Sequence, residues 1–241
     1  MDEILNYIGN EEQRYLNELN SFLKFPSISA DPEHKKDMAD CADWLIDRIK
    51  DAGIEDVRLM ETPGHPIIYA EWKGAGENAP TLLVYGHYDV QPVDPIDLWD
   101  TPPFEPQVRD GFLYARGTSD DKGQLYTYIK AVEAIFKVNG SLPVNIKLLI
   151  EGEEEAQESH LDDFIMENKD MLACDVVAVS DTEWFADELP SICYSLRGIA
   201  FAEVNLTGPN RDLHSGTFGG AVDNPVEVLC RLISKLKDEY G

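Results

Sequence analysis

Short apolar runs alternate with amphipathic segments along the chain as far as Asp181. Residues 36–52 carry apolar side chains at helical spacing, and Gly53 is placed to end that helix. Similar patterns predict helices over Gly123–Phe136 and His160–Glu167. Short, largely apolar runs predict strands at Val57–Met60, Ile67–Trp72, Thr81–Tyr85, Leu113–Ala115, Val144–Ile150 and Val176–Val179. Strands that alternate with helices predict an α/β fold, a three-layer domain with a mainly parallel central sheet.

This alternation stops in the last part of the chain. Ile192–Leu196 and Ala200–Leu206 predict two strands joined by a short turn, and Pro225–Lys237 predicts an amphipathic helix. Two strands and one helix cannot enclose a core of their own. We therefore expect one domain over residues 1–194 and the beginning of a second, α+β domain over residues 195–241.

Acidic side chains greatly outnumber basic ones, with 46 Asp and Glu against 20 Lys and Arg and a formal net charge of −26. Nucleic acid and anionic membranes bind clustered Lys and Arg, so neither is expected as a partner. No apolar run approaches the roughly 18 residues that span a bilayer, and Met1–Ile4 lacks the features of a signal peptide. The cysteines form no C-x-x-C pair, which favours reduced thiols and a cytoplasmic protein. They are Cys41, Cys174, Cys193 and Cys230.

Motifs that combine acidic residues with histidine follow the predicted strands. The first, Gly86-His87-Tyr88-Asp89, comes directly after the strand Thr81–Tyr85. Ligand sites in open α/β sheets gather at the carboxyl ends of such strands. His87 could bind a metal through one ring nitrogen while Asp89 accepts the N–H of the other. Taken alone, the motif is equally consistent with a histidine that caps a strand.

The second motif, Asp120-Asp121-Lys122-Gly123, lies where a loop enters a predicted helix. An acidic pair is favourable at a helix N-terminus for electrostatic reasons, and in isolation that explanation is preferred. The functional interpretation makes Asp120 a carboxylate that bridges two cations. Gly123 would then let the backbone pass close to the site.

The third motif, Glu151–Glu155, directly follows the strand Val144–Ile150. Consecutive glutamates usually form a solvated charge run, but here a central strand delivers them to the edge of the sheet. Two adjacent carboxylates can divide the work, one binding a metal and the other acting as general base on a metal-bound water. Asp181 follows the strand Val176–Val179 in the same way, although a single strand-end Asp is more often a turn residue.

The histidines outside these motifs give weaker signals. His214 lies in the second predicted domain and alone indicates a surface loop, and His34, His65 and His160 have no carboxylate placed to suggest a site. The four acidic motifs nevertheless share a strand-end position. This common placement predicts one hydrolytic metal centre with a spare carboxylate to handle a proton.

These motifs resemble those of the carnosinase-like cytosolic dipeptidases, a branch of the superfamily that includes aminoacylase and carboxypeptidase G. The resemblance runs along nearly all of the chain, and it is strongest at Tyr85–Pro92, Arg116–Gly123 and Asp212–Gly220. It implies a homodimeric dipeptidase that hydrolyses a dipeptide with a water held between two divalent metals, zinc or manganese.

The resemblance also implies a role for each candidate metal ligand. His87 and Asp181 would bind one metal, Asp120 would bridge the two metals, and Glu155 would bind the second. Glu154 would be the catalytic base.

Two further residues would act around the metals. Asp89 would orient the metal-binding histidine, and His214 would reach from the lid domain of the partner subunit to steady the scissile carbonyl. One local departure is Gln157, where the family usually has glycine two residues after the metal-binding glutamate. It changes the turn after the motif without removing a ligand.

The count of ligands is incomplete for the second metal. Asp120 and Glu155 give it two protein ligands, whereas catalytic zinc usually has three. The resemblance puts the missing ligand, the rest of the lid and an arginine for the substrate carboxylate in a C-terminal half that this sequence lacks. We therefore expect residues 1–194 to be the catalytic domain, residues 195–241 to begin a truncated lid and dimerisation domain, and the chain alone to be inactive. The alternatives are an N-acyl amino acid deacylase of the same superfamily and a non-catalytic metal-binding or assembly module.

Overall fold

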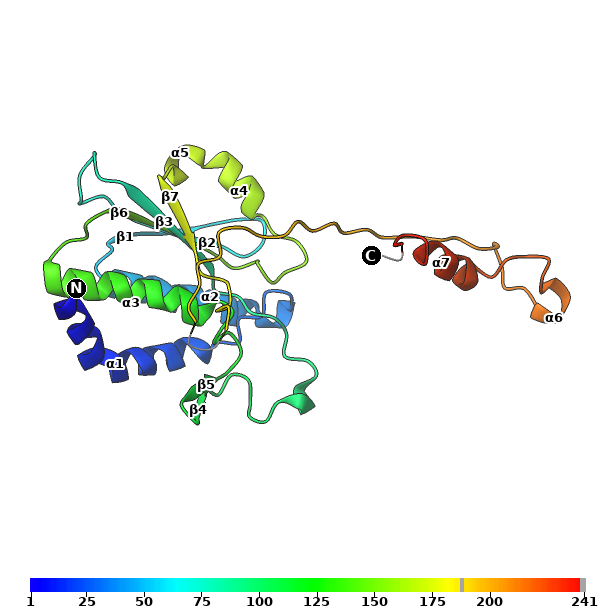
Figure 1. Cartoon of the computed structure of the whole chain (residues 1–241), viewed down its shortest axis with the longest axis horizontal. Coiled ribbons are helices and arrows are strands. Elements are labelled where there is room, and N and C mark those ends of the chain that lie inside the picture. The colour runs from blue at the N-terminus through cyan, green and yellow to red at the C-terminus, as the bar shows by residue number, and fades with distance from the viewer. Residues whose placement is uncertain (187–188, 239–241) are drawn as a thin grey trace. The chain divides into compact units, whose positions relative to one another are not determined.

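A five-stranded sheet organises the first part of the computed structural model, which describes residues 1–186 and 189–238 (Figure 1). The chain divides into two units, Met1–Pro190 and Ser191–Gly241, and the sheet belongs to the first. In sheet order the strands are β1 (Asp56–Met60), β2 (Ile67–Trp72), β6 (Asn145–Glu151), β3 (Thr81–His87) and β7 (Val176–Val179). β3 is parallel to β6 and β7, and β2 is antiparallel to β1 and β6. Only β2 therefore runs against the other four, which confirms the expected mainly parallel sheet.

Helices cover both faces of this sheet and make it the middle of three layers (Figure 1). Because successive side chains of a strand point to opposite faces, Val84 packs in the cluster with α1, α2 and α3, and its neighbour Leu83 packs with α4 and α5. Leu148 and Leu149 of β6 divide in the same way. The helices are α1 (Asp2–Leu23), α2 (Lys35–Asp51), α3 (Lys122–Asn139), α4 (Leu161–Glu167) and α5 (Lys169–Leu172).

The carboxyl ends of the parallel strands meet at one edge of the sheet. Every residue of β6 is buried, including the apolar Ile146, Leu148, Leu149 and Ile150. In the parallel register of β3 and β6, His87 lies opposite Glu151 at the last position of both strands. β7 ends beside them, with Val179 opposite Tyr85. The strand-end motifs are thus delivered to the same edge.

The N-terminal helix α1 was not predicted by the apolar pattern. Only Phe22 and Leu23 of its residues are buried, and polar contacts join it to α3. The Lys122 ammonium donates to the carbonyls of Phe22 at 3.3 Å and Phe25 at 2.8 Å. α1 has 22 residues, but none of the helices in the described residues is both long and apolar enough to cross a membrane.

The long connection between β3 and α3 contains structure of its own. The helical turn η2 (Ile96–Leu98) is followed by a hairpin of β4 (Gln107–Arg109) and β5 (Phe112–Tyr114). Another three-residue turn, η1 (Pro32–His34), leads into α2. The connection is therefore an ordered projection from the sheet edge.

The described residues of the second unit contain two helices, α6 (Ser215–Phe218) and α7 (Pro225–Ile233). The start of α7 follows from local sequence, since Asn224 Oδ1 accepts the N–H of Val226 at 2.9 Å and a proline occupies the first turn. The helix ends at Ile233, short of the predicted Lys237. The helix itself was predicted correctly.

The two strands expected in this unit are absent from its described residues, so that prediction is wrong for this structure. The apolar side chains of the segment are open to solvent, with Ile192 91%, Tyr194 95% and Phe201 94% exposed. An isolated two-stranded hairpin is marginal in water unless a further strand or helix covers it. Here no such cover is supplied, and the apolar pattern alone does not produce pairing.

Candidate metal centre

The amino end of α3 lies against the carboxyl end of β3. The backbone N–H of His87 donates to Asp121 Oδ2 at 3.2 Å. A side chain at Gly86 would interfere, because a Cβ there would lie 2.7 Å from Asp121 Oδ2 and 3.0 Å from Leu125 Cδ1. Glycine at this position therefore lets the acidic motif before α3 approach His87.

Asp89 contacts the buried His87 ring. His87 Nδ1 lies 3.1 Å from the Asp89 carbonyl oxygen and 3.2 Å from its Oδ1. The other carboxylate oxygen accepts from Ser29 Oγ at 2.6 Å and from the Glu155 N–H at 2.9 Å. Burial lowers the pKa of His87, but the hydrogen bond and charge of Asp89 outweigh it and raise that pKa to about 10. Nε2 is left to face the acidic residues.

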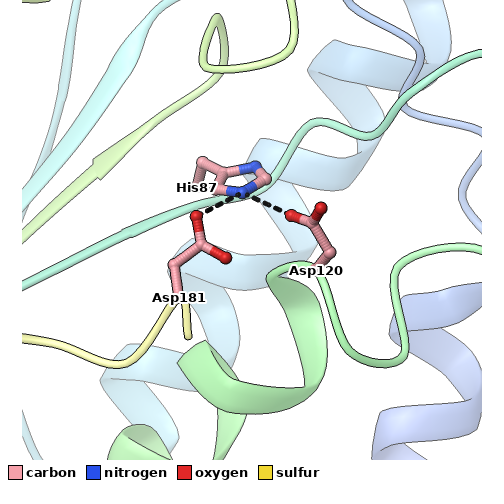
Figure 2. A group of neighbouring side chains, drawn as sticks. All are labelled: His87, Asp120 and Asp181. Carbon is pink, nitrogen blue, oxygen red and sulfur yellow. Dashed lines mark hydrogen bonds and ion pairs between the residues drawn. The ribbon is translucent and has the colours of Figure 1, made fainter. Parts of the chain in front are cut away.

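His87, Asp120 and Asp181 come together at the sheet edge, as the sequence predicted (Figure 2). His87 Nε2 lies 3.1 Å from Asp120 Oδ1 and 3.6 Å from Asp181 Oδ2. One ligand atom from each residue lies within 4.8 Å of the others. They come from the end of β3, the loop before α3 and the segment after β7, so three separate strand connections build one group.

The donor set fits a divalent cation. Zinc binds imidazole nitrogen and carboxylate oxygen at about 2.0–2.2 Å, so two ligands in a tetrahedral site lie about 3.4 Å apart. The two distances from His87 Nε2 bracket that value. The imidazole is fully buried, whereas 60% of the Asp120 side chain and 28% of the Asp181 side chain are exposed. The group is thus anchored on one side and open to solvent on the other.

Glu154 and Glu155 lie in the loop after β6, outside this three-residue group. Glu155 is tied down by its N–H to Asp89 and by a hydrogen bond from Gln91 Nε2 to its Oε2. Burial raises the pKa of Glu155, and the charge of Asp120 raises it further. Burial also raises the pKa of Glu154, which the charge of His87 partly offsets. Both carboxylates are therefore coupled electrostatically to the metal group.

Asp121 is a member of this site to which the sequence analysis gave no role. It is completely buried, and its pKa is raised to about 7, chiefly by burial. Its Oδ1 has no hydrogen-bond partner among the described residues. In the sequence, the signal for Asp121 was its position in the acidic pair with Asp120, but such a pair also suits the start of a helix.

Two of the remaining histidines lie beside a carboxylate, although none of them belongs to the group found among the described residues. His34 Nδ1 lies 2.7 Å from Asp37 Oδ2, and His160 Nδ1 lies 2.9 Å from Glu153 Oε2. His65 has no ring contact with a carboxylate among the contacts of the described residues, but its backbone N–H donates to Glu153. The first pair lies one helical turn apart in sequence. The second depends on how the loop after β6 folds back.

A cavity of about 520 Å³ opens beside Asp120. Sites for small ligands commonly measure about 300–1,000 Å³. Its wall includes Arg116, whose guanidinium lies over the Trp99 ring and donates to the Pro92 carbonyl at 2.9 Å. The cavity extends along η2 and the β4–β5 hairpin, lined among others by Leu98, Arg109, Phe112 and Tyr114. The metal group therefore has room for a small ligand next to it.

His214 belongs to the second unit and forms the cap of α6. Its Nδ1 accepts the backbone N–H of Gly216 at 3.0 Å. It is a polar residue at the start of a four-residue helix.

Comparisons with known proteins identify both parts of the chain. Residues 83–192 match peptidase family M20/M25/M40, and residues 194–241 match a peptidase dimerisation domain. The first range contains His87, Asp120 and Asp181.

The similarity to individual proteins extends beyond these ranges. A Cys-Gly metallodipeptidase of Schizosaccharomyces pombe is 32% identical over 253 residues, covering 100% of this chain and 53% of the relative. A Beta-Ala-His dipeptidase of Mus musculus is 33% identical over 257 residues, with 100% and 52% covered. The solved structure of an M20 family metallo-carboxypeptidase from Sulfolobus solfataricus has a TM-score of 0.76 at 35% identity, covering 94% of this chain and 50% of that protein.

The chain spans about half the length of the curated relatives it matches. Its two matched segments adjoin in sequence, and its identity with peptidases of this type continues from end to end. The chain therefore carries a segment of peptidase family M20/M25/M40 over residues 83–192, followed by a segment of a peptidase dimerisation domain.

Proposed function

We propose that the protein to which this chain belongs is a metal-dependent dipeptidase. The observation that carries the proposal is the meeting of His87, Asp120 and Asp181, whose ligand atoms all lie within 4.8 Å of one another. The names of the relatives, a Cys-Gly metallodipeptidase and a Beta-Ala-His dipeptidase, favour a dipeptide as substrate. The cavity beside Asp120 supports a small substrate.

The proposed cofactor is a pair of divalent ions, zinc or manganese. His87 and Asp181 would hold the first, Asp120 would bridge the two, and Glu155 would hold the second. Nitrogen and carboxylate donors suit both metals. The raised pKa values of Asp181 and Glu155 support this assignment, because a cation would offset the repulsion and burial that raise them.

When bound, the metals would polarise the scissile carbonyl and lower the pKa of the attacking water. Glu154 would take the proton from that water and later deliver it to the leaving amine. Burial raises the pKa of this carboxyl above its usual value, which brings a carboxylate base closer to neutral pH. Asp89 would hold His87 with Nε2 toward the metal.

The proposed catalytic domain covers residues 1–194, and residues 195–241 would begin a lid and dimerisation domain of a cytoplasmic homodimer. The match of residues 194–241 to a peptidase dimerisation domain supports this division. Exposed apolar side chains on α7, including Val226 and Ile233, also favour a partner surface. His214 would act on the substrate carbonyl of the partner subunit.

The test is to load the protein with zinc or manganese and follow release of amino acids from a panel of dipeptides. The panel includes N-acetyl amino acids and longer peptides, because a deacylase or the carboxypeptidase activity named for the Sulfolobus relative would use the same metal group. We expect dipeptides to be cleaved fastest and Glu154→Gln to lose most of the turnover. Cleavage of N-acetyl amino acids without cleavage of any dipeptide would overturn the proposal.

The second metal has only Asp120 and Glu155 among the proposed ligands, so the 241 residues alone are expected to have little activity. A loosely held site loses the benefit of preorganisation. Turnover by this chain at the rate of an ordinary peptidase, abolished by Glu154→Gln, would contradict that expectation.

A further inference from the structure

Glu153 lies within the Glu151–Glu155 run and is nevertheless buried, with only 6% of its surface exposed. Its Oε1 accepts the backbone N–H of His65 at 2.9 Å, and its Oε2 accepts the backbone N–H of His160 at 3.2 Å. The Nδ1 of His160 lies 2.9 Å from the same Oε2. Burying a carboxylate is costly unless hydrogen bonds replace its water. The three contacts with His65 and His160 replace the water that the Glu153 carboxylate would otherwise bind.

The segment before β2 is shaped to receive this carboxylate. A Cβ at Gly64 would lie 1.6 Å from Glu153 Oε1 and 2.6 Å from its carboxyl carbon, so any larger residue would displace one of them. Thr62 Oγ1 holds the turn by accepting the Gly64 N–H at 3.1 Å and donating to the His65 carbonyl at 2.7 Å. The N–H of His65 is thus presented to Glu153 by an ordered turn.

The loop that carries Glu154 and Glu155 is closed at its far end by two neighbouring contacts. Glu151 Oε2 accepts a hydrogen bond from Ser159 Oγ at 3.2 Å, and Glu153 binds the next residue along the chain. A solvated run of glutamates would have no such closure. Glu151 and Glu153 are therefore directed inward and hold the loop.

The same contacts reach the residue that orients His87. His65 Nε2 lies 3.2 Å from the Ser29 carbonyl oxygen, and Ser29 Oγ donates to Asp89 Oδ2. Asp89 in turn accepts the N–H of Glu155. The loop is thus held at both ends by one connected network, through Glu153 at one end and Asp89 at the other.

We propose that Glu153 is a positioning residue, which holds the 152–160 loop so that Glu154 and Glu155 face the metal group. The inference rests on the proposed function, since it adds a residue to the machinery of the same site. Glu153 touches neither metal nor substrate in this role and acts only through the loop.

The experiment compares Glu153→Gln with the matched control Glu133→Gln. Glu133 is an equally buried carboxylate, 3% exposed, that Lys130 Nζ contacts at 2.7 Å in the middle of α3. Glutamine at 153 can still accept from His65, but its NH₂ group would face the N–H donors of His160. Both variants should lower the thermal midpoint, because both leave buried partners unsatisfied.

Only Glu153→Gln should affect the site. In the metal-free protein, amide exchange at Glu154 and Glu155 should accelerate at least tenfold relative to the control. Zinc affinity should fall by about tenfold or more, as for other residues that support metal ligands. His160→Asn, which keeps an N–H donor, should restore most of the protection and affinity that His160→Ala loses.

Unchanged exchange at residues 154 and 155 in Glu153→Gln, or equal losses in the Glu133→Gln control, would overturn the role of Glu153. Failure of the unmodified protein to bind zinc would instead remove the proposed function. The two failures are distinguishable, because amide exchange in the metal-free protein reports on the loop without any metal.

Discussion

Replacing Asp89 by asparagine should weaken metal binding although no ligand is removed. In the native site Asp89 Oδ1 faces His87 Nδ1 at 3.2 Å, and Oδ2 accepts from Ser29 and from the Glu155 N–H. Asparagine has one oxygen and one NH₂ group for these two places. If its NH₂ faces Nδ1, the imidazole must carry its proton on Nε2, the nitrogen turned toward the metal group. If its oxygen faces Nδ1, its NH₂ opposes the N–H of Glu155.

Both arrangements have a calculable cost. Loss of a carboxylate that orients a metal-binding histidine lowers metal affinity by about 10- to 100-fold, which corresponds to about 1.4–2.7 kcal/mol. An unsatisfied buried donor lowers the free energy of unfolding by about 1–3 kcal/mol. We therefore expect Asp89→Asn to lower both zinc affinity and thermal stability within these ranges.

Calorimetric titration of the metal-free protein with zinc measures the first effect, and thermal denaturation measures the second. Asp175→Asn is the matched control, because Asp175 Oδ2 accepts the Thr81 N–H at 2.7 Å at the opposite end of β3. This control should leave zinc affinity unchanged. Zinc binding by Asp89→Asn as tight as that of the unmodified protein would refute the orienting role of Asp89.

Three further predictions follow from individual residues. Glu154→Gln should retain metal content and lose about 10²–10⁴-fold in turnover because it removes a base, whereas Glu155→Gln should lose metal. Equal metal content and equal activity in the two variants would contradict the assignment of Glu154 as base and Glu155 as ligand. Since the pKa of His87 in the metal-free protein is about 10, zinc must displace its proton at pH 7. Calorimetry in buffers of different ionisation enthalpy should find about one proton released, and zinc affinity should rise with pH up to that pKa. Zinc affinity independent of pH would exclude this displacement of a proton from His87. Lys122→Met should lower the free energy of unfolding by about 1–3 kcal/mol in chemical denaturation, because it removes the ammonium that donates to the Phe22 and Phe25 carbonyls at the end of α1 and just beyond it. An unchanged midpoint would show that these contacts do not anchor the end of α1.

The sheet and its edge could be predicted from the sequence because the signals are local. The largely apolar segment Val144–Ile150 indicates a strand buried on both faces, and the observed β6 is buried at every residue. His87, Asp120 and Asp181 each follow a strand or precede a helix. The topology of a parallel sheet then brings such positions together without any knowledge of side-chain contacts.

Other features depend on contacts that the sequence pattern does not contain. Glu153 appears in a run that normally indicates solvent exposure, and its burial depends on the N–H of His65, 88 residues away along the chain. Only the last two residues of α1 are buried, and polar contacts with α3 hold it, such as those of Lys122 with the Phe22 carbonyl and of Lys130 with Glu18. The segment Ile192–Leu206 has the apolar pattern of strands but no described surface that would cover them.

The most direct test of the account is anomalous scattering at the zinc absorption edge from crystals of the zinc-loaded protein. The account predicts a peak among His87 Nε2, Asp120 and Asp181, which disappears in His87→Ala while Glu133→Gln retains it. A peak elsewhere, or a peak of unchanged height in His87→Ala, would contradict the assignment of this group as the metal centre.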